Sequence, residues 1–320
     1  MIIVTSPLRV SLFGGSTDYE SFYKEHGSFI IGTTIDKYIY LSMRYRSKIL
    51  SNESVITYSK CDIVNSWNEI KNPLIRETLK FKKLEKSIDF NSFSDIPTRT
   101  GLGGSSSFCV GLLYTINKLQ DTTQDKKSLI KDAIYIERQI LNESGGIQDQ
   151  IWPIYGGLNT IEILKDGNFF VKPLSVTEEF KKELQSSMIL IYTNDQRSQD
   201  EIAKSHDHTD KLAIKQISHQ AHEYFLHEDI KSIGKLLYES WKEKRNISNL
   251  VSTQKIDNII ETVMSLGAYG VKLLGSGGCG FILVICNSTT KQKINEIFEN
   301  NIMSFNFESK GVSEVFNYKA

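Results

Sequence analysis

Short apolar segments rich in β-branched and aromatic residues alternate along the chain with longer segments whose apolar positions recur at helical spacing. In the first half, the short segments predict strands over residues 2–4, 10–13, 29–31, 38–45, 55–58 and 88–93. The longer segments predict helices over 74–84, from about Ser105 to Leu119, and over 128–141.

The second half continues with both patterns. A hairpin is predicted for 158–164 and 169–171, around the turn Lys165–Asn168. Helices are predicted over 178–185, in pieces over 199–244, and over 256–266, and strands over 188–192, 271–274 and 281–286. The stretch 172–177 is a candidate junction between two domains.

The segment Pro97–Ser107 combines glycines at 101, 103 and 104 with three serines, directly before a strongly apolar helix. Glycines allow a ligand to approach the backbone, and the first amides of a helix are unpaired and point outward. This arrangement predicts an anion site, whereas a flexible linker would not lie between a strand and such a helix. No lysine follows the glycines as a Walker loop requires, so amides, hydroxyls and a metal ion must hold the phosphates.

A second glycine segment, Gly275–Gly280, matches the spacing of a dinucleotide-binding loop. That loop must lead into a helix, but Phe281–Cys286 predicts a strand. We therefore interpret the segment as a close-approach loop between two strands, and a nucleotide-binding oxidoreductase remains the weaker alternative.

Four charged residues lie near these loops in the predicted elements. Arg9 occupies an apolar strand, Asp18 the turn after Gly14, Glu137 an otherwise apolar helix, and Asp149 a glycine-bearing turn. Each alone fits a surface or turn residue. Together with the glycine loop, however, they supply the cradle, metal ligand, carboxylate and cation that phosphoryl transfer needs.

Composition narrows the choice of function. The chain has 320 residues with 38 basic and 38 acidic side chains, and this balance argues against nucleic-acid binding. Its four cysteines form no Cys-x-x-Cys pair, as in reduced cytosolic proteins. His222, Glu223 and His227 miss the zinc-protease spacing by one residue, which favours a solvated helical face. No signal-peptide pattern or membrane-spanning apolar run is present, so we expect a cytoplasmic protein.

The segments Pro7–Tyr19, Pro97–Ser107, Gly145–Gln150 and Lys272–Gly280 together resemble the GHMP kinases, in the right order. Within that superfamily, the first and third segments are similar to the sugar 1-kinases. The resemblance implies ATP-dependent phosphorylation of the anomeric hydroxyl of a phosphorylated heptose. Another sugar such as fucose or galactose, or a non-catalytic sensor on the same fold, remains an alternative.

The resemblance also implies residue roles. Asp149 matches the catalytic base and Arg9 the arginine near the reacting hydroxyl, while Ser105 and Glu137 match the ligands of Mg²⁺. One departure is Gly104, which stands where many members have serine, so Ser106 is an alternative metal ligand. The implied ATP-binding residues are Pro97, Arg99, Gly101, Leu102, Gly103, Gly104, Ser105, Ser106 and Ser107. The implied sugar-binding residues are Gly15, Asp18, Tyr19 and Gly146, and the implied substrate or phosphate loop contains Lys272, Gly275, Gly277 and Gly278.

The implied fold is α+β with two lobes, an ATP-binding domain over 1–172 and a C-terminal domain over 173–320. The first lobe is expected to contain a left-handed βαβ crossover and the second to be ferredoxin-like. Partners are expected to be a sugar phosphate and ATP, with no nucleic acid or membrane, in a monomer or homodimer.

A phosphorylated heptose requires donors for a second phosphate, far from the anomeric carbon. Three sets of residues are candidates: Arg44 with Arg46, Lys172, and Arg197 with Ser198. The last set is preferred, because it follows a predicted strand and resembles a segment of heptose kinases, although Asn194 replaces a glycine there.

Overall fold

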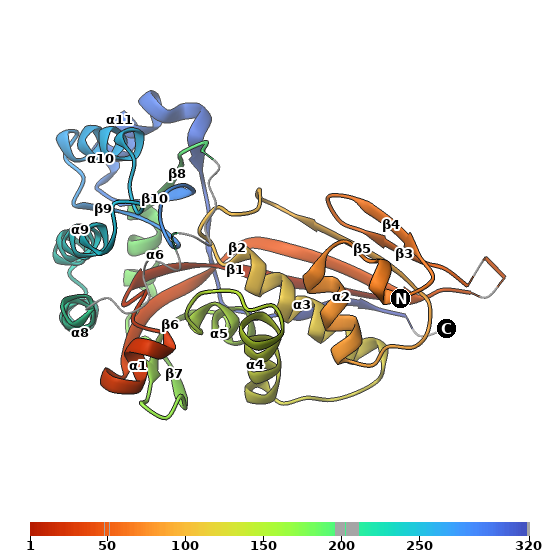
Figure 1. Cartoon of the computed structure of the whole chain (residues 1–320). Coiled ribbons are helices and arrows are strands. Elements are labelled where there is room, and N and C mark those ends of the chain that lie inside the picture. Colours follow the sequence, from red (N-terminus) through yellow and green to blue (C-terminus); the bar gives the residue numbers. More distant parts are fainter. Residues whose placement is uncertain (48, 51, 196–201, 203–210, 319–320) are drawn as a thin grey trace.

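The computed structural model describes residues 1–47, 49–50, 52–195, 202 and 211–318, and it arranges them in two lobes, each built on its own sheet (Figure 1). The larger sheet follows the order β13-β1-β2-β5-β3-β4, with β6 and β12 also paired to β2 and β7 paired to β6. Its strands are β1 (Ile2–Phe13), β2 (Ser28–Tyr45), β3 (Ser54–Thr57), β4 (Cys61–Val64), β5 (Ile88–Ser94), β6 (Leu158–Ile163), β7 (Phe169–Pro173), β12 (Phe307–Glu308) and β13 (Ser313–Asn317).

The first strand is continuous, so the prediction of two strands separated at Ser6-Pro7 is wrong. β13 pairs with β1 only as far as Thr5, and the pairing with β2 shifts register after Pro7. A proline, which has no N–H to donate, is therefore accommodated where one side of the strand lacks a partner. The second strand is likewise continuous through the predicted gap between 31 and 38, because β1 pairs along its length.

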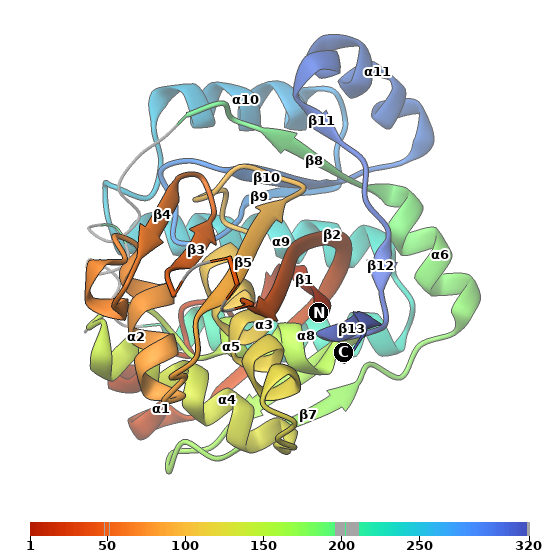
Figure 2. The same ribbon diagram turned by 90° about the vertical axis from the view of Figure 1, so that its right-hand side faces the viewer.

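Helices cover one face of this sheet (Figure 2), and α3 contributes ten buried residues to this packing. Val110, Leu112, Leu113 and Ile116 of α3 have no exposed surface and pack against β1, β2 and α5. The helical elements of the first lobe are α1 (Glu20–His26), η1 (Trp67–Glu69), α2 (Pro73–Phe81), α3 (Gly104–Leu119), α4 (Lys126–Ile134), η2 (Tyr135–Ile140) and α5 (Gln148–Tyr155).

The helix predicted over 128–141 changes character within that range. α4 ends at Ile134, and the chain continues as the π-helical turn η2. Such wider turns are uncommon and are often found at functional sites. This turn contains Glu137, which is buried rather than solvated.

The second lobe has the sheet order β11-β8-β10-β9, in which each neighbouring pair is antiparallel. The succession of a strand, helices, two strands, a helix and a strand is the ferredoxin-like arrangement that was predicted. Its elements are α6 (Glu178–Ser187), β8 (Met188–Tyr192), α8 (Leu212–Leu226), α9 (Ile230–Ile247), α10 (Gln254–Ser265), β9 (Gly270–Leu273), β10 (Phe281–Ile285), α11 (Ser288–Phe298), η3 (Glu299–Asn301) and β11 (Ile302–Met303).

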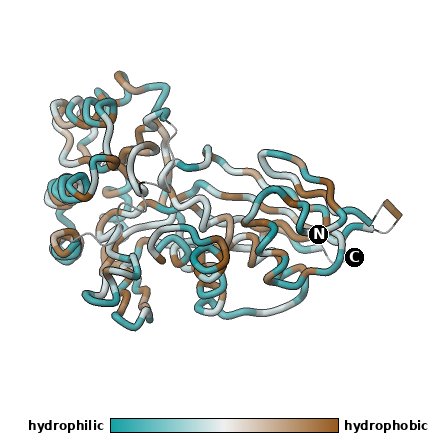
Figure 3. Tube along the Cα trace, in the orientation of Figure 1, coloured by the Kyte–Doolittle hydropathy of each residue, from teal (hydrophilic) through white to brown (hydrophobic). Residues whose placement is uncertain are grey.

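Among the described residues, one of three apolar clusters contains residues of both lobes. Phe13 of β1 meets Phe225 of α8 edge to face, with ring centroids 6.2 Å apart. The apolar positions of α8 to α11 recur along the helices between polar ones (Figure 3), as expected for helices with one buried side. After β11 the chain returns to the first lobe, where β12 pairs with β2 and β13 with β1, so the end of the predicted second domain belongs to the first sheet. In the described parts of the chain, no helix is both long and apolar enough to cross a bilayer.

Candidate active site

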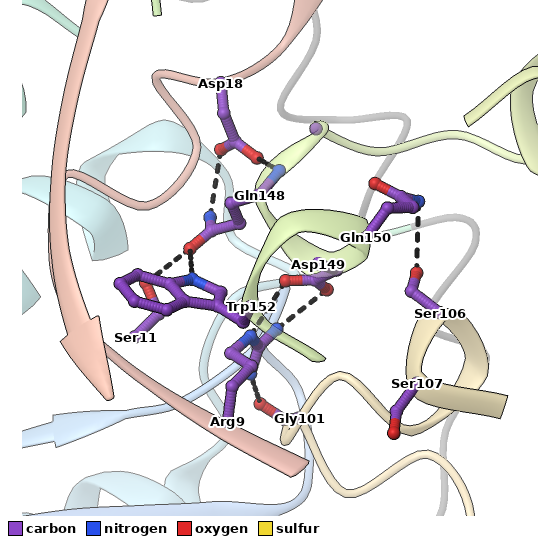
Figure 4. Close-up of polar contacts among 12 residues, drawn as sticks. Arg9, Ser11, Asp18, Gly101, Ser106, Ser107, Gln148, Asp149, Gln150 and Trp152 are labelled. Atoms are coloured by element: carbon purple, nitrogen blue, oxygen red, sulfur yellow. Dashed lines mark hydrogen bonds and ion pairs between the residues drawn. The ribbon is translucent and has the colours of Figure 1, made fainter. Parts of the chain in front are cut away.

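Arg9 and Asp149 form a bidentate ion pair, although they lie far apart in the sequence (Figure 4). Nε and Nη2 of Arg9 each lie 2.8 Å from one carboxylate oxygen of Asp149, at the start of α5. Nη1 of Arg9 donates to the carbonyl oxygen of Gly101 at 2.6 Å. Arg9 is 4% exposed, so its charge is fixed in place between the carboxylate and the glycine loop.

Asp18 fixes the turn that leads into α5. Its carboxylate accepts hydrogen bonds from the backbone N–H and the side-chain amide of Gln148, each at 3.0 Å. Burial is the largest influence on Asp18 and raises its pKa, while these hydrogen bonds lower it and Asp149 adds to the rise. Gln148 in turn accepts from Ser11 at 2.8 Å and lies next to Trp152 (Figure 4). Asp18 therefore positions Asp149 through the adjacent residue, Gln148. Direct contact of Asp18 with a sugar stays a prediction.

Glu137 and Ser106 meet on the other side of Asp149. Ser106 Oγ donates to Glu137 at 3.1 Å, and the side-chain amide of Gln150 donates to both residues. Burial raises the pKa of Glu137, partly offset by Arg138 and by these hydrogen bonds. Gln148 and Gln150 thus extend from one helical turn to opposite sides of Asp149 (Figure 4).

This second cluster fits a magnesium ion. A buried carboxylate, a hydroxyl and a side-chain amide supply hard oxygen atoms, and Oε1 of Gln150 is buried without a hydrogen-bond partner. Mg²⁺ commonly takes only one or two protein ligands and completes its shell with water and phosphate oxygens. In the described ranges, no three acidic, histidine or cysteine side chains are grouped for a metal. The contact of Glu137 is with Ser106, whereas Ser105 lies exposed at the start of α3.

The glycine loop has the backbone of an anion cradle. Gly101 and Gly103 have φ angles of 80° and 74°, which favour glycine, and α3 begins at the next residue, Gly104. The amides of its first turn have no partner within the helix and are available to a phosphate. The buried hydroxyl of Ser107 lies within hydrogen-bond distance of the carbonyl oxygens of Ser6 and Pro7 in β1, and its role in ATP binding stays a prediction.

The side chains at the ends of this loop are placed differently from one another. Pro97 and Arg99 are exposed, and Leu102 is buried while its carbonyl accepts from the N–H of Arg9 at 3.1 Å. Any contact of Leu102 with ATP would therefore be through its backbone.

The loop Gly275–Gly280 joins two neighbouring strands, as predicted, and packs on the first glycine loop. A Cβ atom on Gly101 would lie 2.6 Å from the carbonyl oxygen of Leu274, and Phe281 donates to the carbonyl of Thr100 at 3.1 Å. Gly278 donates to Val251 at 2.8 Å, and Gly277 also abuts Val251, so this end of the loop serves packing.

Lys272, at the start of this region, is 4% exposed and donates to the carbonyl of Leu12 at 2.9 Å. Burial and the nearby Arg9 lower the pKa of Lys272 to about 7. Lys272, which was predicted to lie in the substrate or phosphate loop, is thus one of a set of buried basic side chains that also includes Arg9.

The remaining predicted positions are two sugar-binding residues and the candidates for binding the second phosphate. Gly15 lies beside Ser11 and Gln148, and Tyr19 is buried at the start of α1 with its ring 4.8 Å from Nζ of Lys211. Arg44 and Arg46 both pair with Asp89, and Lys172 is exposed on β7. Arg197 and Ser198 lie outside the described residues.

Sequence reasoning missed Ser11, Gln148 and Gln150. The two glutamines are the sequence neighbours of Asp149, and successive side chains on a helix point about 100° apart. This spacing could have predicted that they extend to opposite sides of Asp149. Ser11 lacked any local signal.

Two family models match the chain in order: the GHMP kinases N terminal domain over residues 70–157 and the GHMP kinases C terminal over 221–301. Together they cover more than half of the chain, which therefore belongs to the GHMP kinases. Within this superfamily the protein is a kinase, a transferase.

Curated relatives and solved structures agree with this class. D-glycero-alpha-D-manno-heptose 7-phosphate kinase of Campylobacter jejuni is 28% identical, over 96% of each chain. The galactokinase of Pyrococcus furiosus is 26% identical over 97% of this chain and 96% of its own. A D-glycero-D-manno-heptose 1-phosphate kinase from Bacteroides thetaiotaomicron has the same fold, with a TM-score of 0.81 and 24% identity over all of both chains.

Proposed function

We propose that the protein transfers the γ-phosphoryl group of ATP to O1 of D-glycero-α-D-manno-heptose 7-phosphate, giving the 1,7-bisphosphate for surface-polysaccharide biosynthesis in the cytoplasm. The observation that carries the reaction type is the arrangement around Asp149: Arg9 pairs with it, and the Asp18 and Glu137 clusters lie on its two sides. The heptose is supported by the similarity to the Campylobacter jejuni enzyme.

In this proposal Asp149 acts as the base. It accepts the proton of the O1 hydroxyl while O1 bonds to the γ-phosphorus and the bond from that phosphorus to the bridging oxygen breaks. ADP leaves with the electron pair of the broken bond. Arg9 keeps the carboxylate oriented through two hydrogen bonds and holds the glycine loop through a third.

The other residues bind and orient the two substrates. Amides of the first turn of α3 receive the phosphates, and Lys272 adds positive charge near Arg9. Ser106 and Glu137 would hold Mg²⁺, which neutralises phosphate charge when bound. Ser105 remains a second candidate ligand.

A kinase assay across sugars tests the substrate. Purified protein with ATP and Mg²⁺ is given heptose 7-phosphate, mannose, fucose or galactose, and ADP release is measured together with the ³¹P spectrum of the product. We expect the highest kcat/KM with heptose 7-phosphate and a new anomeric phosphate signal. Preference for fucose or galactose would contradict the heptose assignment, and binding of sugar and ATP without turnover would indicate a sensor.

The second phosphate of the heptose needs its own donors. Because Arg44 and Arg46 are paired with Asp89, Arg197 with Ser198 stays the preferred candidate for this role. Arg197→Ala is expected to raise KM for heptose 7-phosphate about tenfold, consistent with the loss of one charge-assisted contact. It should leave KM for the unphosphorylated heptose nearly unchanged, and equal losses on both sugars would contradict this role.

A further inference from the structure

Lys244 of α9 is a buried lysine that belongs to none of the sequence motifs of the site. Its side chain is enclosed, with 4% of the residue exposed, and Nζ donates to the carbonyl oxygens of Leu273, at 3.4 Å, and Gly275. Among the described residues no carboxylate forms an ion pair with it. Burying an ammonium group without a counter-ion is costly, so a lysine at this position calls for a compensating interaction.

The contacts of Lys244 continue into the reaction centre. Gly275, which accepts its hydrogen bond, packs against Gly101 of the first glycine loop. Gly101 accepts from Arg9, and Arg9 pairs with Asp149. A single path of direct contacts therefore joins α9 of the second lobe to the carboxylate at the start of α5.

The charges along this path are unbalanced. Burial lowers the pKa of Lys244 well below its ordinary value, and Lys272 and Arg9 lower it further. Lys244, Lys272 and Arg9 are thus three basic groups close together. Among the described residues, the carboxylate in contact with them is that of Asp149, which pairs with Arg9. An anion that enters beside them would relieve the repulsion and favour the protonated amines.

On the basis of the proposed function, we propose that Lys244 is a positioning residue for phosphoryl transfer. Its side-chain nitrogen donates to the loop Gly275–Gly280, holds this loop against the glycine loop at Gly101 and so sets Arg9 and Asp149. When ATP binds, Lys244 and Lys272 supply buried positive charge that balances the phosphates.

Lys244→Met tests this role, because methionine fills a similar apolar volume without the charge or the donor. We expect kcat for the preferred sugar to fall at least tenfold. The melting temperature should stay within a few degrees of wild type, and ATP should bind with a stoichiometry near one. Lys242→Met is the matched control: Lys242 is exposed on the same helix, beside Tyr238, and its loss should leave kcat unchanged.

Proton uptake on ATP binding gives a second readout that a purely structural role would not change. Calorimetry in two buffers of different ionisation enthalpy, at pH 8, measures the protons taken up per ATP. Wild type and Lys242→Met should take up the same fraction of a proton, and Lys244→Met should take up less. If Lys244→Met does not fold, Lys244→Gln replaces it with the same two readouts.

The outcomes separate this proposal from the proposed function. A wild-type protein that binds ATP but phosphorylates no sugar contradicts the proposed function, and the proton uptake then decides the role of Lys244. Unchanged kcat and unchanged proton uptake in a folded Lys244→Met variant would overturn the role. The role would also be overturned if kcat fell only in proportion to a lower melting temperature and a lower ATP-binding stoichiometry, because the variant would then be partly unfolded.

Discussion

The backbone of Gly146 lies against the carboxylate of Asp18, so closely that a Cβ atom at position 146 would overlap the Asp18 oxygens. The same turn is fixed by Arg138, which donates to the carbonyl of Gly146 at 2.7 Å, and by the N–H of Ile147, which donates to the carbonyl of Asp18 at 3.2 Å. The turn that aims Asp149 is therefore built around a residue without a side chain.

Gly146→Ala should displace Asp18 and with it the start of α5. We expect a loss of about 1–3 kcal/mol in the free energy of unfolding, the range for overpacking a buried site. The kcat should fall at least tenfold, because a small misplacement of a catalytic group is costly. Urea unfolding and steady-state kinetics measure the two effects. Ser144→Ala in the same loop is the control, and a Gly146→Ala variant that matched it in both would contradict the steric argument.

Asp149→Asn keeps the size of the side chain but removes its charge and basicity. We expect kcat to fall about a hundredfold or more, the range for losing a general base, with ATP affinity nearly unchanged. Steady-state kinetics and an ATP titration measure these effects. Asp166→Asn, in the exposed turn between β6 and β7, should behave as wild type. A variant that kept more than half of the wild-type kcat would rule out the base and leave an orienting role for Asp149.

The loops were predictable from the sequence because each is a local pattern. Glycine density, the apolar helix after Ser105 and the strand after Gly280 are all contained in a few neighbouring residues. The ferredoxin-like second lobe followed from the resemblance of these segments and not from composition. The packing of the two glycine loops on each other was not predicted.

Contacts between distant segments were not accessible in the same way. The local pattern favoured a turn residue at Asp149 and a solvated helical position at Glu137. Tertiary packing instead pairs Asp149 with Arg9 and buries Glu137. Strand pairing also overrode the local signal of a proline, which predicts a break in the strand. Pro7 lies inside β1 because β13, on one side of β1, pairs only as far as Thr5, while β2 continues on the other side. Lys244 carries no motif, and only the packing of α9 on β9 brings it to the glycine loops.

The choice of metal ligands can be tested by two matched pairs of variants. Glu137→Gln removes an anionic oxygen and Ser106→Ala a hydroxyl, so both should raise the Mg²⁺ concentration needed for half-maximal activity several-fold. KM for the sugar should change less. Glu162→Gln, exposed on β6, and Ser105→Ala are the respective comparisons. A larger effect from Ser105→Ala than from Ser106→Ala would return the ligand to the position that the family resemblance implies.

The buried Lys272 should make stability depend on pH in a defined direction. Its pKa is about 7 in the folded protein, lowered first by burial and then by Arg9, and near 10.4 in an unfolded chain. Between these values the unfolded state binds more protons than the folded state, so the contribution of this group to the free energy of unfolding rises with pH. Below about pH 7 both states are protonated, and the full cost of burying the charge is present.

Lys272→Met removes this cost together with the hydrogen bond to Leu12, which does not depend on pH in the same way. The free energy of unfolding of the variant minus that of wild type should therefore be most positive at or below pH 7. It should fall steadily towards pH 10, by up to about 1.4 kcal/mol for each unit by which the pKa is lowered. Urea unfolding at several pH values between 6 and 9.5 measures the difference. Lys293→Met, an exposed lysine on α11, should show a difference that is flat with pH. A flat difference for Lys272→Met as well would mean that Lys272 titrates like a solvated lysine, which would contradict the lowering of its pKa by burial and Arg9.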